Sequence, residues 1–131
     1  MLKQLLLIAV PLLTAIPSLF CQQDAREHCG LLKTHKLRYL SIADSSAYII
    51  LNGDSAIEYH HYDKYRLTAR LEWAGECEYN LILSSVDIPG FVYHPGDVMH
   101  VRIDRIEGDL IYYYSTINGN GWEGKLRILP N

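Results

Sequence analysis

The fold of this chain is decided by two neighbouring stretches, RLTARLEW at residues 66–73 and CEYNLIL at residues 77–83. Apolar residues occupy alternate positions in both, which is the period of a β-strand with one buried face. Only residues 74–76 separate the two stretches. We therefore expect two antiparallel strands joined as a hairpin.

The same alternation continues on both sides of this hairpin, over residues 37–129. Residues 98–106 and 110–114 form a second expected hairpin, because Gly108 supplies the positive φ that a tight turn needs. We expect about eight strands in sequential order and no helix after residue 21. Such a meander leaves exposed edges unless it closes. The sequence therefore predicts an all-β fold, as a small calycin- or lipocalin-like barrel or a strongly coiled sheet.

The apolar face of each expected strand predicts the core. We expect the following side chains to be buried: Ile57, Leu67, Leu71, Trp73, Tyr79, Leu81, Ile103 and Ile128. The charged residues between them, such as Arg66 and Glu72, are expected to face solvent. The interior of an eight-stranded barrel is either filled by side chains or holds one small ligand.

The amino terminus has the pattern of a secretory signal. Lys3 precedes an apolar run over residues 5–16, which contains Pro11 and is shorter than the ~20 residues that a membrane-spanning helix needs. We expect residues 1–21 to be a signal peptide, residues 29–131 to form a single domain, and the mature chain to have no transmembrane helix. Cys21 follows the apolar run as in a bacterial lipoprotein signal. Lipidation of Cys21 and ordinary cleavage near it therefore both stay open, and we expect the protein in the periplasm, the cell envelope or the medium.

The cysteine count predicts one disulfide. The chain has three cysteines, and only Cys29 and Cys77 remain as thiols once Cys21 has been removed or acylated. Two cysteines in an oxidising compartment usually pair. We predict a Cys29–Cys77 bond that ties the start of the domain to the sheet.

Charge excludes some partners. The formal net charge is −3 at pH 7, and the chain has no run of Lys or Arg that could follow a phosphate backbone. We therefore expect no nucleic acid partner and no attraction to anionic membrane surfaces.

The sequence offers no convincing catalytic or metal-binding pattern. Ser45, Ser46 and Ser55 lack the Gly-x-Ser-x-Gly frame of a nucleophile elbow. His60 and His61 are neighbours on a strand and point to opposite faces, so they cannot hold one ion together, and we expect exposed strand histidines. We predict a chain that is not an enzyme and that uses no cofactor and no metal.

Aromatic residues are the more informative feature. The chain has ten tyrosines against two phenylalanines and two tryptophans, and tyrosine suits half-wet binding faces. Tyr112, Tyr113 and Tyr114 are consecutive, so two of them face one way and one the other. Two interpretations stay open. The tyrosines pack against neighbouring strands, or together with Trp122 they line a barrel mouth or groove that contacts a ligand or a partner.

A few spaced motifs stand out across residues 29–129: Cys29, Ile57-Glu58, Trp73-x-x-x-Cys77-x-Tyr79-x-Leu81, Ile103-x-x-Ile106-x-Gly108-Asp109 and Gly124-x-Leu126. In these motifs the chain resembles small exported all-β proteins that are common in flavobacteria and their relatives. The resemblance implies the fold and export. It transfers no catalytic residue, because that group has no activity that can be named.

Two functions from different classes remain. The first is an exported binding module for a small apolar or aromatic ligand. The second is a structural or protein-interaction domain of the envelope, with a filled core and no small-molecule ligand. The barrel interior separates the two, since an internal cavity above ~300 Å³ favours a ligand and a filled core favours a partner protein.

Overall fold

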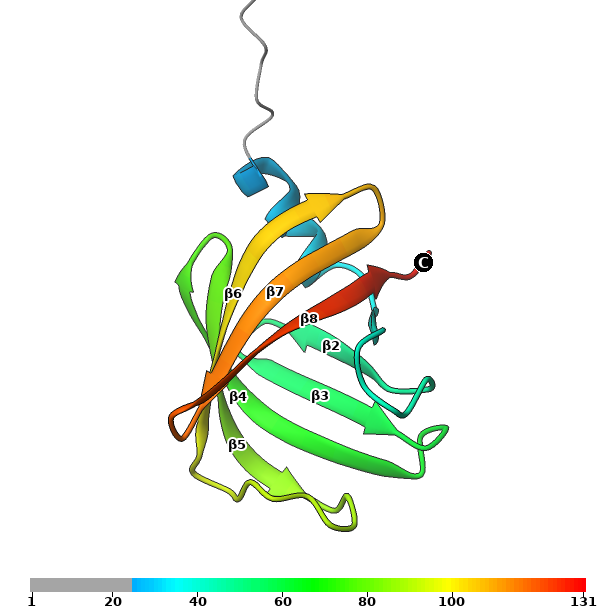
Figure 1. The fold of residues 1–131 in the computed structure, drawn as a ribbon, viewed down its shortest axis with the longest axis vertical. Coiled ribbons are helices and arrows are strands. Elements are labelled where there is room, and N and C mark those ends of the chain that lie inside the picture. Colours follow the sequence, from blue (N-terminus) through cyan, green and yellow to red (C-terminus); the bar gives the residue numbers. More distant parts are fainter. Residues whose placement is uncertain (1–24) are drawn as a thin grey trace, which may run out of the picture.

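The alternating stretches form eight antiparallel strands that close into a barrel in the computed structural model, which describes residues 25–131 (Figure 1). The strands are β1 (Leu37–Tyr39), β2 (Tyr48–Asn52), β3 (Ser55–His60), β4 (Tyr65–Gly75), β5 (Glu78–Val86), β6 (Val98–Glu107), β7 (Leu110–Ile117) and β8 (Asn120–Ile128). The all-β fold and the meander order are as predicted. The predicted signal peptide and Cys21 lie outside the described residues.

The barrel closes through its shortest strand. In β1, Leu37 pairs with Ile49 of β2 on one side and with Ile128 of β8 on the other. Every strand of the described residues therefore has two neighbours, and none of these strands leaves an edge to pair with another chain. Two register shifts between β4 and β5 and one between β6 and β7 help these long strands to bend around the barrel.

The inward faces follow the predicted alternation in β4 and β5. Leu67, Leu71, Tyr79 and Leu81 are buried, and Ile103 of β6 is buried with them. The prediction was wrong for Ile57, which is only half-buried. It pairs with Thr68, whose neighbours Leu67 and Ala69 point inward, so both Ile57 and Thr68 lie on the outer face.

Trp73 and Ile128 are also half-buried and not in the core. Both lie near the last residue of their strands, so each packs against the core at one end of the barrel and keeps one side toward solvent.

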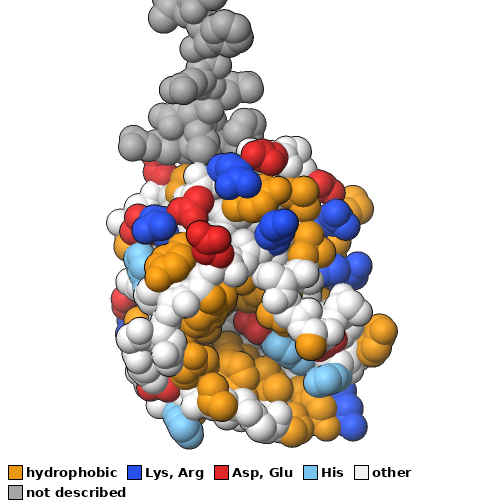
Figure 2. All heavy atoms as spheres, viewed as in Figure 1, with side chains coloured by type: hydrophobic (Ala, Val, Ile, Leu, Met, Phe, Trp, Pro, Cys, Tyr) orange, Lys and Arg blue, Asp and Glu red, His pale blue; other side chains and the backbone are white. Residues whose placement is uncertain are grey.

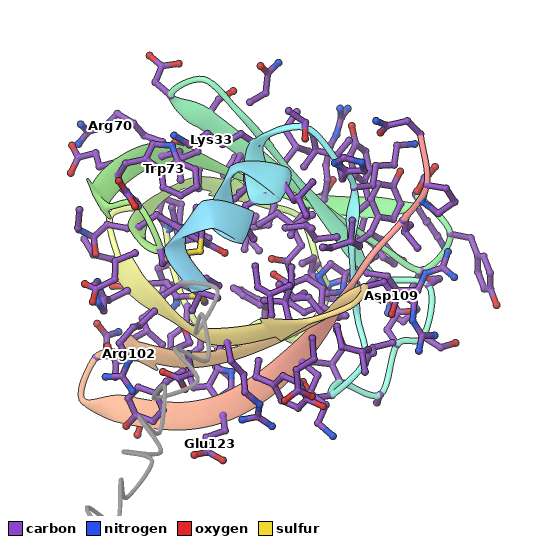
Figure 3. All side chains as sticks on the ribbon, turned by 90° about the horizontal axis from the view of Figure 1, so that it is seen from above. Lys33, Arg70, Trp73, Arg102, Asp109 and Glu123 are labelled. Atoms are coloured by element: carbon purple, nitrogen blue, oxygen red, sulfur yellow. A yellow bond between two sulfur atoms is a disulfide. The ribbon has the colours of Figure 1, made fainter. Side chains whose placement is uncertain are left out.

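A 3₁₀ helix that the sequence did not predict, η1 (Ala25–Lys33), lies across one end of the barrel (Figure 3). Leu32 and Cys29 of this helix are buried where it packs against the barrel. The ammonium of Lys33 sits 4.5 Å above the ring of Trp73. The predicted disulfide joins Cys29 to Cys77, with 5.5 Å between the two Cα atoms, and it fixes η1 to the β4–β5 turn.

The two ends of the barrel differ as a result. Toward η1, the interior is filled by Leu32, Leu51, Leu71, Ile103 and Ile111. The opposite end is surrounded by the β1–β2 loop, the β3–β4 turn, the β5–β6 loop over residues 87–97 and the β7–β8 turn. Over residues 25–131, no helix has the length and apolar character needed to cross a bilayer.

Candidate functional site

A cavity of about 290 Å³ occupies the half of the barrel that faces away from η1. Its wall consists mainly of apolar and aromatic side chains from the inward faces of the strands and from two loops: Tyr39, Ile42, Glu58, His60, Tyr79, Leu81, Phe91, Tyr93, Met99, Val101, Tyr113, Ser115, Trp122 and Leu126. Figure 2 shows a hollow in the lower half of the molecule that is walled by hydrophobic side chains.

Three polar residues of this wall form a connected cluster with Asp44 of the β1–β2 loop, which lies beside His60 and does not itself line the cavity. The hydroxyl of Tyr39 donates to Glu58 Oε2 at 2.9 Å, and His60 Nε2 lies 2.6 Å from Glu58 Oε1. The other ring nitrogen of His60, Nδ1, lies 3.5 Å from Asp44 Oδ2. We call Tyr39, Glu58, His60 and Asp44 the Glu58 cluster. Glu58 and His60 come from the inward face of β3, and each side chain is only 11% exposed.

The Glu58 cluster is electrostatically coupled. The hydrogen bond to Glu58 raises the pKa of His60 above its ordinary value, and the negative charges of Glu58 and Asp44 act in the same direction against burial. Burial, together with the charge of Glu58, raises the pKa of the Tyr39 hydroxyl well above its ordinary value. Tyr39 therefore stays neutral and serves Glu58 as a hydrogen-bond donor.

Asp44 connects the Glu58 cluster to the loops at the mouth. Burial alone would raise the pKa of Asp44, but hydrogen bonds from Ser46 and from the backbone N–H of His61 outweigh it and lower the pKa to about 2. These bonds hold the β1–β2 loop against the β3–β4 turn. That turn contains His61, Tyr62 and Asp63, all with positive φ, a conformation that non-glycine residues rarely adopt. Asp44 thus supports a strained turn beside His60.

The aromatic part of the wall depends on one glycine. Tyr113 of β7 pairs with Gly124 of β8, and a β-carbon at Gly124 would overlap the Tyr113 ring. The missing side chain lets the ring lie directly over β8 inside the barrel. Burial raises the pKa of the Tyr113 hydroxyl, so this group is neutral and polar within the wall.

The four aromatic residues singled out from the sequence divide between two surfaces. Tyr113 and Trp122 line the cavity. Tyr112 and Tyr114 are on the outer face, where the guanidinium groups of Arg105 and Arg102 lie over their rings. The structure thus places one of the three consecutive tyrosines inside and two outside.

The two histidines also divide. His61 is exposed as expected, but His60 is buried, so the prediction of an exposed strand histidine was wrong for His60. Tyr39 and Glu58 were not predicted as site residues from the sequence. Its apolar pattern assigned Ile57 to the core, which would turn Glu58 and His60 toward solvent.

A signal for the correct face was present in the β3–β4 hairpin. Glu58 pairs with Leu67 in this hairpin, and directly opposed residues on antiparallel strands share a face. Since Leu67 is clearly inward by its own pattern, a prediction of this register would have turned Glu58 and His60 into the barrel.

In the part of the chain that the structure describes, no group of three or more His, Cys, Asp or Glu residues is arranged to hold a metal ion. Comparisons with family models, with curated proteins and with solved structures find no match for this chain. The resemblance to exported flavobacterial proteins therefore stays a prediction, and function must be argued from the cavity and its chemistry.

Proposed function

We propose that this chain is an exported binding module of the periplasm or cell envelope that holds one small, mainly apolar or aromatic molecule inside the barrel. The observation that supports this most is the cavity, because a chain with a filled core would have no internal volume to offer. Its wall follows the usual composition of a ligand site, with a mainly apolar lining and a few polar groups that converge on one side.

The volume of the cavity limits the size of the ligand. At about 290 Å³ the cavity lies just under the ~300–1,000 Å³ that is typical of small-molecule sites. An engineered protein cavity of ~150 Å³ holds benzene. A cavity about twice that size fits one aromatic ring with a short chain, and it is too small for a long-chain lipid.

The mouth of the barrel supports entry from this end. Within residues 29–131, the large hydrophobic side chains that remain exposed are Leu40, Ile42, Tyr62, Val92 and Val98. All belong to the loops and strand starts that surround the open end. This apolar rim also suits the alternative function, a domain that docks an envelope protein.

Ligand-observed NMR with propylbenzene tests the proposal. Saturable binding to the folded protein is expected. Met99→Trp would fill the cavity and should abolish binding. Glu72→Trp adds the same ring at an exposed position of β4, away from the cavity and its mouth, and should leave binding unchanged. No saturable binding of propylbenzene or of charged molecules of similar shape to the wild-type protein would contradict the binding module and favour the interaction domain. Binding that survives in folded Met99→Trp would show that the cavity is not the site.

A further inference from the structure

The charges in the cavity point to one class of ligand. Glu58 and His60 are the ionisable acid and base in its wall, and among the described residues no Lys or Arg lines it. His60 lies between two carboxylates, Glu58 on one side and Asp44 on the other. The Glu58 cluster therefore carries a net negative charge even when His60 is protonated.

The net negative charge of the Glu58 cluster disfavours a carboxylate ligand. An anion entering the cavity would meet no cation except His60, which already bonds to Glu58 at 2.6 Å. Removing a carboxylate from water without a free cationic partner is costly. Fatty acids and aromatic acids are therefore poor candidates.

Glu58 keeps the capacity to bind a donor. One of its oxygens accepts from Tyr39 and the other is bonded to His60. A carboxylate oxygen accepts more than one hydrogen bond, so Glu58 can still accept a hydrogen bond from a donor on a ligand. Ser115 is the other small polar side chain in the wall, and its hydroxyl already donates to the backbone carbonyl of His100 at 3.0 Å.

The aromatic residues reinforce the preference for a cation. Tyr79, Tyr113 and Trp122 contribute aromatic rings from the strands, and Phe91 and Tyr93 contribute two more from the β5–β6 loop, where they pack edge to face with ring centroids 5.8 Å apart. The faces of such rings attract an organic ammonium. The rings also shield the interaction with Glu58 from water, which strengthens it.

We infer that the ligand is a small organic amine, an aromatic or short aliphatic group that carries an ammonium bound by Glu58 with the ring in the apolar part of the cavity. This inference rests on the proposed function, since it assumes that the cavity binds a ligand. It adds the charge of that ligand and the residue that selects it.

Three probes of similar shape and different charge test the inference: phenethylamine, propylbenzene and phenylpropionate. Competition in the ligand-observed NMR experiment gives their relative affinities for the full mature chain. We expect phenethylamine to bind at least about tenfold more tightly than propylbenzene, because it adds a hydrogen bond to a charged group, and phenylpropionate to bind most weakly. Binding of propylbenzene with no preference for the amine, or a preference for the acid, would overturn the inference and leave the binding module standing. No binding by any probe would overturn both.

The variant Glu58→Gln tests whether the charge of Glu58 selects the amine. It keeps the shape of the side chain and removes its charge, so affinity for phenethylamine should fall about tenfold while affinity for propylbenzene stays within about twofold. Glu123→Gln removes the same charge from an exposed site on β8 and should change neither. Equal losses for both probes in Glu58→Gln, or unchanged affinity for the amine, would contradict a role for Glu58. If Glu58→Gln does not fold, the three probes on the wild-type protein still decide the inference.

Discussion

His60 Nε2 lies 2.6 Å from Glu58 Oε1 inside the barrel, on strand β3. The apolar Ile57 of the same strand lies on the outer face. Two polar residues thus follow Ala56 on the inward face of β3, and each is kept there by hydrogen-bonded partners. Glu58 and His60 line the cavity and are also hydrogen-bonded to each other, so changes in their charge should affect both ligand binding and the stability of the domain.

The first prediction is a loss of stability as pH rises. Folding raises the pKa of His60. Its protonated ring therefore contributes fully to the free energy of unfolding at pH values below its ordinary pKa of ~6.5, and this contribution is lost as the pH rises through the higher pKa of the folded state. Thermal unfolding between about pH 5 and pH 9 should show this decline, and His60→Gln should make the curve flatter. An equally steep decline in His60→Gln would assign the effect to another group.

The second prediction concerns the disulfide. Cys29 and Cys77 are 48 residues apart, and opening a loop of that length should cost ~4 kcal/mol of unfolding free energy in the chain-entropy account. Denaturant unfolding of the double variant Cys29→Ser/Cys77→Ser measures the loss. Thiol titration of the mature wild-type protein under denaturing, non-reducing conditions should find no reactive thiol. Two reactive thiols would show that the bond does not form.

The third prediction concerns the close contact between β7 and β8. Gly124→Ala forces the Tyr113 ring off the strand and into the cavity, which should cost ~1–3 kcal/mol by overpacking and weaken propylbenzene binding. The control is Gly75→Ala, where the nearest atom to an added β-carbon is 4.0 Å away, with an expected change below ~0.5 kcal/mol. Chemical denaturation of both variants checks the difference, and equal effects would refute the contact.

The fourth prediction separates the two faces of the β3–β4 hairpin. Leu67→Ala should cost ~2–5 kcal/mol because Leu67 is 2% exposed at the barrel interior. Ile57→Ala should cost less than ~1.5 kcal/mol, since Ile57 is half-buried on the outer face. Denaturant titration of the two variants compares them. A larger loss for Ile57→Ala would mean that the register of β3 is shifted by one residue.

The fifth prediction concerns export. Mass spectrometry of the mature protein should find a new amino terminus within a few residues of Cys21, because Lys3 and the apolar run after it have the pattern of a secretory signal. A diacylglyceryl mass on Cys21 would establish the lipoprotein route, and its absence would establish ordinary cleavage. Detection of the intact Met1 terminus in the envelope fraction would contradict export.

The strands and their order were predictable from local information. The alternation in residues 66–73 and 77–83 sets the inward faces of β4 and β5, because a strand with one buried face needs an apolar residue at every second position. Gly108 marks the β6–β7 turn and has a φ of 62°. The pairing of Cys29 with Cys77 followed from counting once Cys21 is assigned to the predicted signal, since the two cysteines that remain leave only one bond to form.

The cavity and its chemistry were decided by the tertiary structure. Glu58 and His60 face inward because the β3–β4 register sets them on the same side as Leu67, and this register outweighs the local preference of Ile57 for the core. Tyr39 and Asp44 join them only when β1 closes the barrel and the β1–β2 loop meets the β3–β4 turn. Periodicity along one strand determines where a strand forms, but pairing between strands determines which residues meet. The sequence by itself therefore determined the strands and their meander order, and only the closure of the barrel brought the Glu58 cluster to the wall of an aromatic cavity.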